Sequence, residues 1–247
     1  MEPQQTLGLA HFLAQADAVG KTLLVIMLLM SVVTWYLIVT KAIVALTTRR
    51  RSRRFLDRFW NAPSLQAVAT QLENDHPDEP FSHLTWHAIV AARHHQRHGA
   101  NRLDEAGSGA DFITRAMRRV IDEETARFES GLTVLASIGS TAPFIGLFGT
   151  VWGIYHALVN IGMSGQGTLD KVAGPVGEAL IMTALGLAVA IPAVLAYNFA
   201  VRSNRLVLAQ LDSFAHDLYA FLTTGSHVND VAAVAPLRPA AVARAGA

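Results

Sequence analysis

Residues 172–201 read VAGPVGEALIMTALGLAVAIPAVLAYNFAV, a run of 30 residues interrupted by a single charge, that of Glu178. A helix needs roughly 20 apolar residues to cross a hydrocarbon core about 30 Å thick, so this run is long enough to span a membrane. Two other stretches meet the same criterion: residues 22–40, which are uncharged between Lys21 and Lys41, and a part of the uncharged residues 130–169. The sequence therefore predicts an all-α membrane protein with three transmembrane helices.

The composition agrees with this class of protein. The chain is 51% hydrophobic and 16% charged, whereas soluble domains carry about 25% charged residues. It has no cysteine, which excludes disulfides and thiolate metal sites. No phosphate-binding loop and no hydrolase or metalloprotease motif is present. We therefore expect no enzyme activity, no cofactor and no nucleic-acid partner.

Basic residues predict the orientation in the membrane, because they accumulate on the cytoplasmic side. They flank the cytoplasmic ends of all three spans: Arg49, Arg50, Arg51, Arg53, Arg54 and Arg58 after the first, Arg115, Arg118, Arg119 and Arg127 before the second, and Arg202 and Arg205 after the third. The tail before Lys21 has no Lys or Arg, and the only charged residues in the connection between spans two and three are Asp170 and Lys171. We expect a bacterial inner-membrane protein with a periplasmic N-terminus and a cytoplasmic C-terminus.

The chain divides into eight segments. We expect a periplasmic amphipathic segment at 1–20, spans at 21–43, 131–160 and 173–202, a cytoplasmic helical region at 44–130, a periplasmic loop at 161–172, a cytoplasmic helical extension at 203–225 and a disordered tail at 226–247. Within the cytoplasmic region the pattern favours helices near 52–74, near 80–98 and from 106 onward. Turn-forming residues at 61–63, 75–80 and 99–101 interrupt this pattern. The last of these helices is predicted to run unbroken into the second span, so that two long helices, those of spans two and three, extend into the cytoplasm.

Small residues follow one face of each of the last two spans, at steps of three and four. They are Ala136, Gly139, Pro143, Gly146, Thr150, Gly153 and Ala157 in the second span, and Ala179, Thr183, Gly186, Ala190, Ala193 and Tyr197 in the third. Two interpretations stay open: close approach of helices, or a lining for a pore that another helix enters. Pro143 and Pro192 lie inside the spans and predict a kink or a hinge in each helix.

Three polar residues stand out within the spans. Thr150 and Thr183 each lie about 15 Å from the outer membrane edge, at a rise of about 1.5 Å per residue. Their hydroxyls can bond their own helix or contribute to a proton path. Glu178 can cap the start of the third helix, but a carboxyl inside a span more often marks an ion route. In the cytoplasmic region His83 and His87 have metal-ligand spacing, yet no acidic residue occurs from His83 to His98, so we expect solvated histidines and no metal site.

Residues 140–154, STAPFIGLFGTVWGI, resemble the second-span motif of the ExbB/TolQ family, and residues 177–198, GEALIMTALGLAVAIPAVLAYN, resemble its third-span motif. The resemblance covers residues 10–225 and is closer to the ExbB branch; the sequence departs from the motifs at Met182, Tyr155 and His156.

The resemblance implies a ring-shaped homopentamer in the membrane lipids, with spans two and three around a pore that holds the single spans of two ExbD subunits. Such a complex uses the proton motive force to energise TonB for the import of siderophores and vitamin B12. The matching proton-path positions are Thr150, Thr183 and Glu178, and the small residues that would face the pore are Gly139, Pro143, Gly146, Gly153, Ala179, Gly186 and Ala190. A TolQ-like subunit of the Tol-Pal system and a non-conducting membrane scaffold remain the alternatives.

Overall fold

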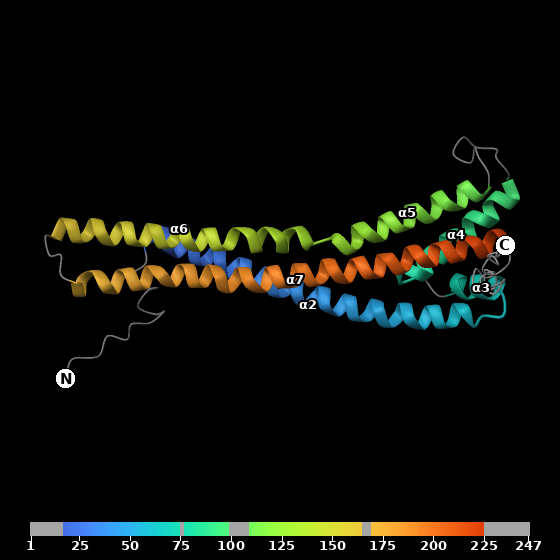
Figure 1. The fold of residues 1–247 in the computed structure, drawn as a ribbon, viewed down its shortest axis with the longest axis horizontal. Helices are drawn as coiled ribbons and strands as arrows, with labels where there is room; N and C mark the ends of the chain where they lie inside the picture. The colour runs from blue at the N-terminus through green and yellow to red at the C-terminus, as the bar shows by residue number, and fades with distance from the viewer. Residues whose placement is uncertain (1–16, 75–76, 99–108, 165–168, 225–247) are drawn as a thin grey trace, which may run out of the picture. The chain divides into compact units, whose positions relative to one another are not determined.

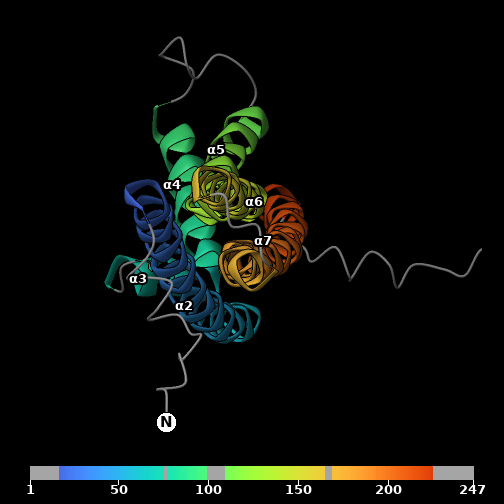
Figure 2. The same ribbon diagram turned by 90° about the vertical axis from the view of Figure 1, so that its left-hand side faces the viewer.

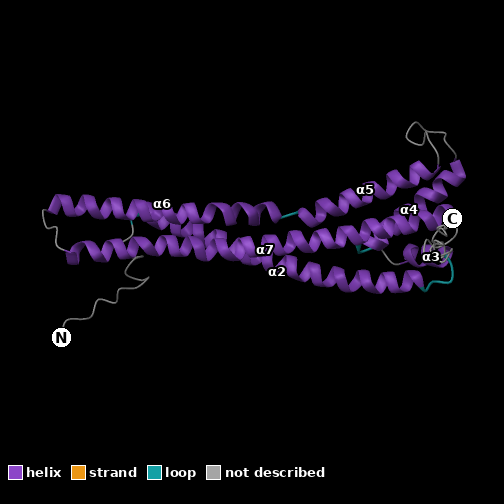
Figure 3. Ribbon diagram, viewed as in Figure 1, coloured by secondary structure: helices purple, strands orange, loops and turns teal. Residues whose placement is uncertain are grey.

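The computed structural model describes residues 17–74, 77–98, 109–164 and 169–224. The predicted amphipathic segment before residue 17, the tail at 226–247 and part of the outer loop lie outside these ranges. The described residues form six helices: α2 (Ala18–Trp60), α3 (Leu65–Asn74), α4 (Pro80–His98), α5 (Gly109–Glu129), α6 (Leu132–Ser164) and α7 (Leu169–Thr224) (Figure 1). No strand occurs among them (Figure 3). Three helical stretches are long and apolar enough to cross a membrane, so the described residues confirm the predicted all-α class with three candidate spans.

The chain divides into two compact units. The first contains residues 1–46 and 129–204, and the second contains residues 47–128 and 205–247. We call them the spanning unit and the polar unit, because the apolar runs fall in the first and most of the arginine-rich segments in the second.

The helix of the first span is longer than predicted. Helix α2 continues without interruption from Ala18 to Trp60, since neither glycine nor proline occurs between Lys21 and Trp60. The prediction of one helix over 52–74 is therefore wrong: residues 52–60 belong to α2, and α3 begins only at Leu65. The chain turns around Pro63, which has no backbone N–H to donate, and the Ser64 hydroxyl then accepts a bond from the N–H of Ala67 at 3.2 Å.

The prediction of an unbroken helix from residue 106 into the second span is also wrong. Helix α5 ends at Glu129 and α6 begins at Leu132. Between them Gly131 has a φ of 75°, a left-handed conformation that glycine adopts without steric cost. A Cβ there would lie 3.2 Å from Cδ2 of Leu37, so both conformation and space favour glycine. This one residue was the signal in the sequence for the end of a helix.

Helix α4 covers Pro80–His98, which coincides with the helix predicted near 80–98. Helix α7 runs for 56 residues, from Leu169 through Pro192 to Thr224, so the third span does continue into its amphipathic extension. The loop predicted at 161–172 is too long, because α6 ends only at Ser164 and α7 already begins at Leu169.

The polar unit has an aromatic and aliphatic core. Phe214 of α7 contacts Phe59 and Phe81 edge to face, with ring centroids 5.2 Å and 5.5 Å apart. Leu84 and Leu218 are fully buried beside them. The packing joins α2, α3, α4, α5 and α7 within the unit, because each contributes one apolar face at helical spacing.

In the spanning unit α6 and α7 lie side by side, and the first part of α2 packs alongside them (Figure 2). The contact along α2 includes Met27, Met30 and Leu37, which meet residues of both other helices. Large apolar side chains on the outer faces of the three helices remain exposed in the single chain, as membrane lipid or neighbouring helices require.

Thr34 of α2 is a polar residue in the interior of this unit. Its side chain is fully buried, and its hydroxyl has no hydrogen-bond partner among the described residues. An unsatisfied buried hydroxyl costs about 1–3 kcal/mol. We predict that Thr34→Val, which keeps the volume and removes the hydroxyl, raises the free energy of unfolding by about 1 kcal/mol. Thr40→Val is the matched control, since the Thr40 hydroxyl donates to the carbonyl of Tyr36 at 2.8 Å. Unfolding in detergent micelles followed by circular dichroism measures both. A larger loss of stability in Thr34→Val than in Thr40→Val would contradict the prediction.

Candidate functional site

Glycines bring the backbones of α6 and α7 into direct contact. A Cβ on Gly146 would lie 2.7 Å from the carbonyl oxygen of Met182 and 3.1 Å from Cα of Gly186. A Cβ on Gly186 would in turn lie 2.7 Å from the carbonyl oxygen of Ala142. Cβ atoms essentially never approach other atoms this closely, so these positions require glycine.

The same stripe continues toward both ends of the hairpin. A Cβ on Gly139 would meet the side chain of Val194, and one on Gly153 would meet Ala179 at 3.0 Å. Ala190 is also buried. Within one chain, therefore, much of the predicted stripe faces the neighbouring helix, as close helix approach explains. A pore-facing role for Gly139, Pro143, Gly146, Gly153, Ala179, Gly186 and Ala190 stays a prediction about the assembled protein.

Thr150 of α6 and Thr183 of α7 come together at this contact. Their Oγ1 atoms are hydrogen-bonded to each other, although 33 residues separate them in the chain. The Thr150 hydroxyl also donates to the carbonyl of Gly146 at 3.0 Å. Thr150 is buried and Thr183 half-buried. The sequence predicted the common depth of the two threonines, and the structure adds that they form one polar pair.

The number of hydroxyl protons shows which threonine is the donor in the bond between the two. A threonine hydroxyl has one proton to donate and two lone pairs to accept with. Because the Thr150 proton goes to Gly146, Thr183 must be the donor in the bond between the two threonines. The Thr183 oxygen then keeps both of its lone pairs, so this half-buried hydroxyl can accept a hydrogen bond from a group outside the hairpin.

The other predicted site residues occupy helical positions in the hairpin. Glu178 lies in α7, one to two turns from Thr183, and its side chain is outside the described part of the structure. Pro143 lies inside α6 and Pro192 inside α7, and both helices continue through them. Proline at these positions removes one backbone hydrogen bond from each helix, and the kink or hinge stays a prediction.

A polar contact that the sequence did not indicate joins the start of α2 to α6 in the spanning unit. The indole N–H of Trp152 donates to a carboxylate oxygen of Asp17 at 2.7 Å, and the second oxygen accepts from the backbone N–H of Gly20 at 2.7 Å. These bonds hold the pKa of Asp17 below its usual range. The His156 ring packs against the Trp152 ring, with centroids 4.6 Å apart. The start of α2 is thereby attached to α6, and an aspartate directly before Ala18, the first residue of the helix, was the only sequence signal.

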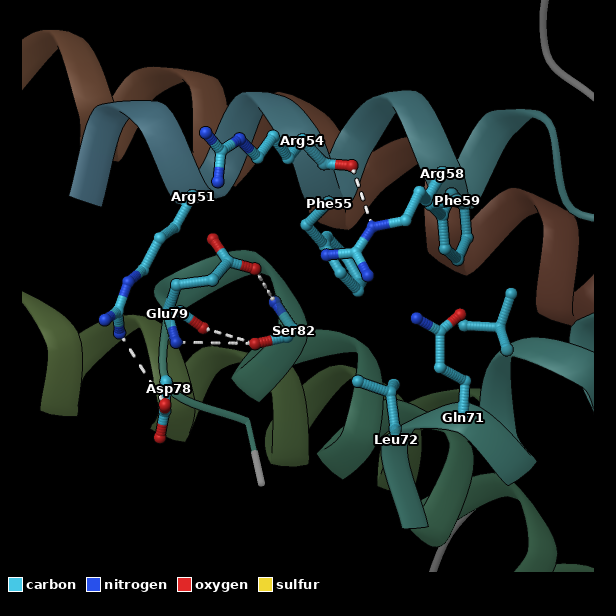
Figure 4. Close-up of a pocket in the computed structure, with 11 residues that line it drawn as sticks. Arg51, Arg54, Phe55, Arg58, Phe59, Gln71, Leu72, Asp78, Glu79 and Ser82 are labelled. Atoms are coloured by element: carbon cyan, nitrogen blue, oxygen red, sulfur yellow. Dashed lines mark hydrogen bonds and ion pairs between the residues drawn. The ribbon is translucent and has the colours of Figure 1, made fainter. Parts of the chain in front are cut away.

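The polar unit contains a separate cavity of about 290 Å³, formed by α2, α3 and the start of α4 (Figure 4). Arg51 of α2 forms an ion pair with Asp78 at 3.6 Å, and Arg58 donates from Nε to the carbonyl of Arg54 at 3.2 Å. The Glu79 carboxylate also lines the cavity, and this residue is buried. None of the predicted site residues lies in this cavity.

Glu79 caps helix α4 and ties it to α2. Its carboxylate accepts from the backbone N–H of Ser82 at 2.5 Å, from that of Phe81 at 3.3 Å and from the Ser52 hydroxyl at 2.7 Å. Burial nevertheless raises the pKa of Glu79 above its ordinary value of 4.5, and these hydrogen bonds only partly oppose the rise. The cavity is therefore best explained as part of a helix-capping arrangement.

The raised pKa of Glu79 predicts a pH-dependent stability. The folded protein retains this proton at a higher pH than the unfolded chain does, so the contribution of the group is complete below pH 4.5 and is lost as the pH rises through the raised pKa. We expect the free energy of unfolding of the wild type to fall relative to that of Glu79→Gln as the pH rises above 4.5. Denaturation at a series of pH values measures both proteins, and parallel curves would contradict the prediction.

The described residues contain no group of three or more His, Cys, Asp or Glu side chains placed to hold a metal ion.

The motifs that form the hairpin also place the chain in a family. Residues 85–213 match the model of the MotA/TolQ/ExbB proton channel family. The chain belongs to this family. The match includes the whole of α6, Thr150 and Thr183, and the part of α7 that packs on α6.

Several curated relatives align with this chain over most of its length. The biopolymer transport protein ExbB of Xanthomonas campestris pv. campestris is 46% identical over 213 residues, which are 85% of this chain and 84% of the relative. The ExbB protein of Neisseria meningitidis is 46% identical over 198 residues, 80% of this chain and 89% of the relative. The Tol-Pal system protein TolQ of Pseudomonas aeruginosa is 34% identical over 221 residues, 88% of this chain and 94% of the relative. These matches confirm the resemblance that the two span motifs indicated.

Proposed function

We propose that this chain is an ExbB-like subunit of an inner-membrane proton channel, which works with ExbD and uses the proton motive force to energise TonB. In this proposal five copies form a ring, spans two and three surround its pore, and the single spans of two ExbD subunits occupy the pore. The N-terminus is periplasmic and the C-terminus cytoplasmic, as the arginines after the first and third spans favour. The import served is that of siderophores and vitamin B12 across the outer membrane.

The observation that supports the proposal most is the Thr150–Thr183 pair in a hairpin that belongs to a proton channel family. The identities favour an ExbB-like role over a TolQ-like one, since the ExbB proteins of Xanthomonas campestris and Neisseria meningitidis are 46% identical to this chain and the TolQ protein of Pseudomonas aeruginosa is 34% identical. The two roles use the same proton-driven mechanism. Expression of this chain in strains that lack either ExbB or TolQ distinguishes them, because the chain should restore function only in the strain whose protein it can replace.

The mechanism needs no bond-making chemistry by this chain. A proton that crosses the membrane releases about 2.3 kcal/mol per 100 mV. A carboxyl on the partner helix takes up that proton on one side and loses it on the other. While protonated, it donates to the free lone pairs of Thr183. When ionised, it no longer has a proton to donate, so its preferred position changes. The partner helix is thereby biased between positions.

Glu178 is proposed as the protonatable group of this chain. It lies toward the outer end of α7 relative to Thr183, and a carboxyl inside a span is stable only if it faces water or protein. In the proposal it passes protons toward the threonine pair. The rival role, in which it caps the helix start, requires no proton transfer at all.

Two measurements test the proposed function. A single-span protein with an aspartate in its span should co-purify with this chain, and liposomes that contain the complex should show proton flux that is lost in Glu178→Ala. Absence of such a partner, together with flux that is no greater than in empty liposomes, would favour the non-conducting scaffold. Flux that persists in Glu178→Ala would reassign Glu178 to the structural role while leaving the channel intact.

A further inference from the structure

Two histidines of the polar unit lie one helical turn apart on α4, outside every site described so far. The rings of His83 and His87 have centroids 4.8 Å apart. His87 is exposed and His83 half-buried, so solvent ions reach the pair. Two histidines at positions i and i+4 on one helix face are a recurring arrangement for binding zinc.

The acidic partner that the local sequence lacks comes from another helix. Glu124 of α5 is buried, and its Oε1 lies 3.0 Å from Nδ1 of His83, although the residues are 41 positions apart. Arg127 lies 3.8 Å from the same oxygen. A carboxylate that accepts from Nδ1–H of a neutral imidazole leaves the lone pair on Nε2, which is the form that binds a metal. Glu124 therefore sets the tautomer of His83.

The second histidine is suited to the same role. Its side chain is exposed, so a ring nitrogen of His87 can bind an ion while water fills the remaining coordination positions. Glu123 is bonded to Arg119 at 3.0 Å, so we assign it no ligand role.

We propose that His83 and His87 bind one divalent transition-metal ion of the class that includes Zn²⁺, with Glu124 as the outer carboxylate that orients His83. His83 binds through Nε2, His87 through a ring nitrogen, and water completes the coordination. The site consists of two protein ligands and is independent of the proposed channel function. Because Glu124 belongs to α5 and both ligands to α4, bound metal also strengthens the contact between these two helices.

The test is a titration of the full chain, purified in detergent, with Zn²⁺ alone against a chromogenic chelator of known affinity. We expect His87→Ala and His83→Asn to weaken Zn²⁺ binding at least as much as loss of an outer-shell partner does, about 10–100-fold, and Glu124→Gln to weaken it about 10-fold. In His83→Asn the amide still donates to Glu124, so α4 and α5 stay joined while the ligand atom is lost. Circular dichroism checks that the helices are retained.

His94→Ala is the matched control, because His94 lies on the same helix and has the same spacing to His98. It should leave Zn²⁺ affinity unchanged. Unchanged affinity in His87→Ala and His83→Asn would overturn the proposal, and so would an equal loss in His94→Ala, which would show non-specific binding to histidines. Full affinity in Glu124→Gln would overturn the role of Glu124 as the orienting carboxylate.

Discussion

Thr183→Val is expected to abolish proton-coupled uptake while the complex still assembles. Valine has nearly the shape of threonine, and the Thr150 hydroxyl keeps its bond to the carbonyl of Gly146, so the hairpin loses no packing. What disappears is the half-buried oxygen that is free to accept from a partner carboxyl. The protonated partner carboxyl is then left without an acceptor inside the membrane, which costs about 1–3 kcal/mol and corresponds to a loss of about 5- to 150-fold in the coupled step.

Uptake of an iron–siderophore in a strain that lacks its own copy of the protein measures this effect. Thr183→Ser is the matched control, because serine retains the hydroxyl and should retain uptake. Thr150→Val should also abolish uptake, since the Thr183 proton then loses its acceptor and the direction of the pair is no longer set. Size-exclusion chromatography with the partner checks assembly. Wild-type uptake in both valine variants would refute the role of the pair.

Gly146→Ala is expected to destabilise the spanning unit strongly. The new Cβ would meet the Met182 carbonyl oxygen at 2.7 Å and the Gly186 backbone at 3.1 Å. Backbone atoms cannot rotate away as a flexible side chain does, so α6 and α7 must separate along their line of contact. Overpacking of this kind costs about 1–3 kcal/mol, and separation of the helices also breaks the bond between Thr150 and Thr183.

Gly162→Ala is the matched control for this prediction. It lies in the same helix, and a Cβ there would meet nothing within 4 Å. Alanine gains about 1 kcal/mol over glycine in a helix at either position, so the difference between the two variants isolates the clash. Unfolding in mixed detergent micelles measures it. Equal stability of the two variants would contradict the close approach of α6 and α7.

Some features of the fold could be predicted because they depend on local sequence. Helix α4 begins at Pro80, and α7 continues through its apolar run to Thr224. The junction at residues 130–131 was missed, because one glycine after a polar helix is weak evidence until a φ of 75° and the side chain of Leu37 show why it is needed. Asn61 and Pro63 did indicate a break, but the helical pattern on both sides is similar, so a separate helix α3 was not predicted.

The residues of the candidate site could be predicted, but their contacts with each other could not. Thr150 and Thr183 were found from their depth and from the stripes around them, and the family match agrees with the motifs that contain them. Their bond to each other, and the donor and acceptor roles within it, depend on the meeting of two helices at Gly146 and Gly186. Asp17 and Trp152 were missed because 135 residues separate them.

By itself the sequence determined that this chain has three stretches long and apolar enough to cross a membrane, and to which family it belongs. Hydrophobicity and motifs are properties of contiguous residues, so they can be read without knowledge of the fold. The tertiary structure alone decided which polar groups meet: Thr150 with Thr183, Asp17 with Trp152, and Glu124 with His83. The physical reason is that a hydrogen bond depends on the distance between two atoms in space, and residues far apart in the chain acquire that distance only when their helices pack.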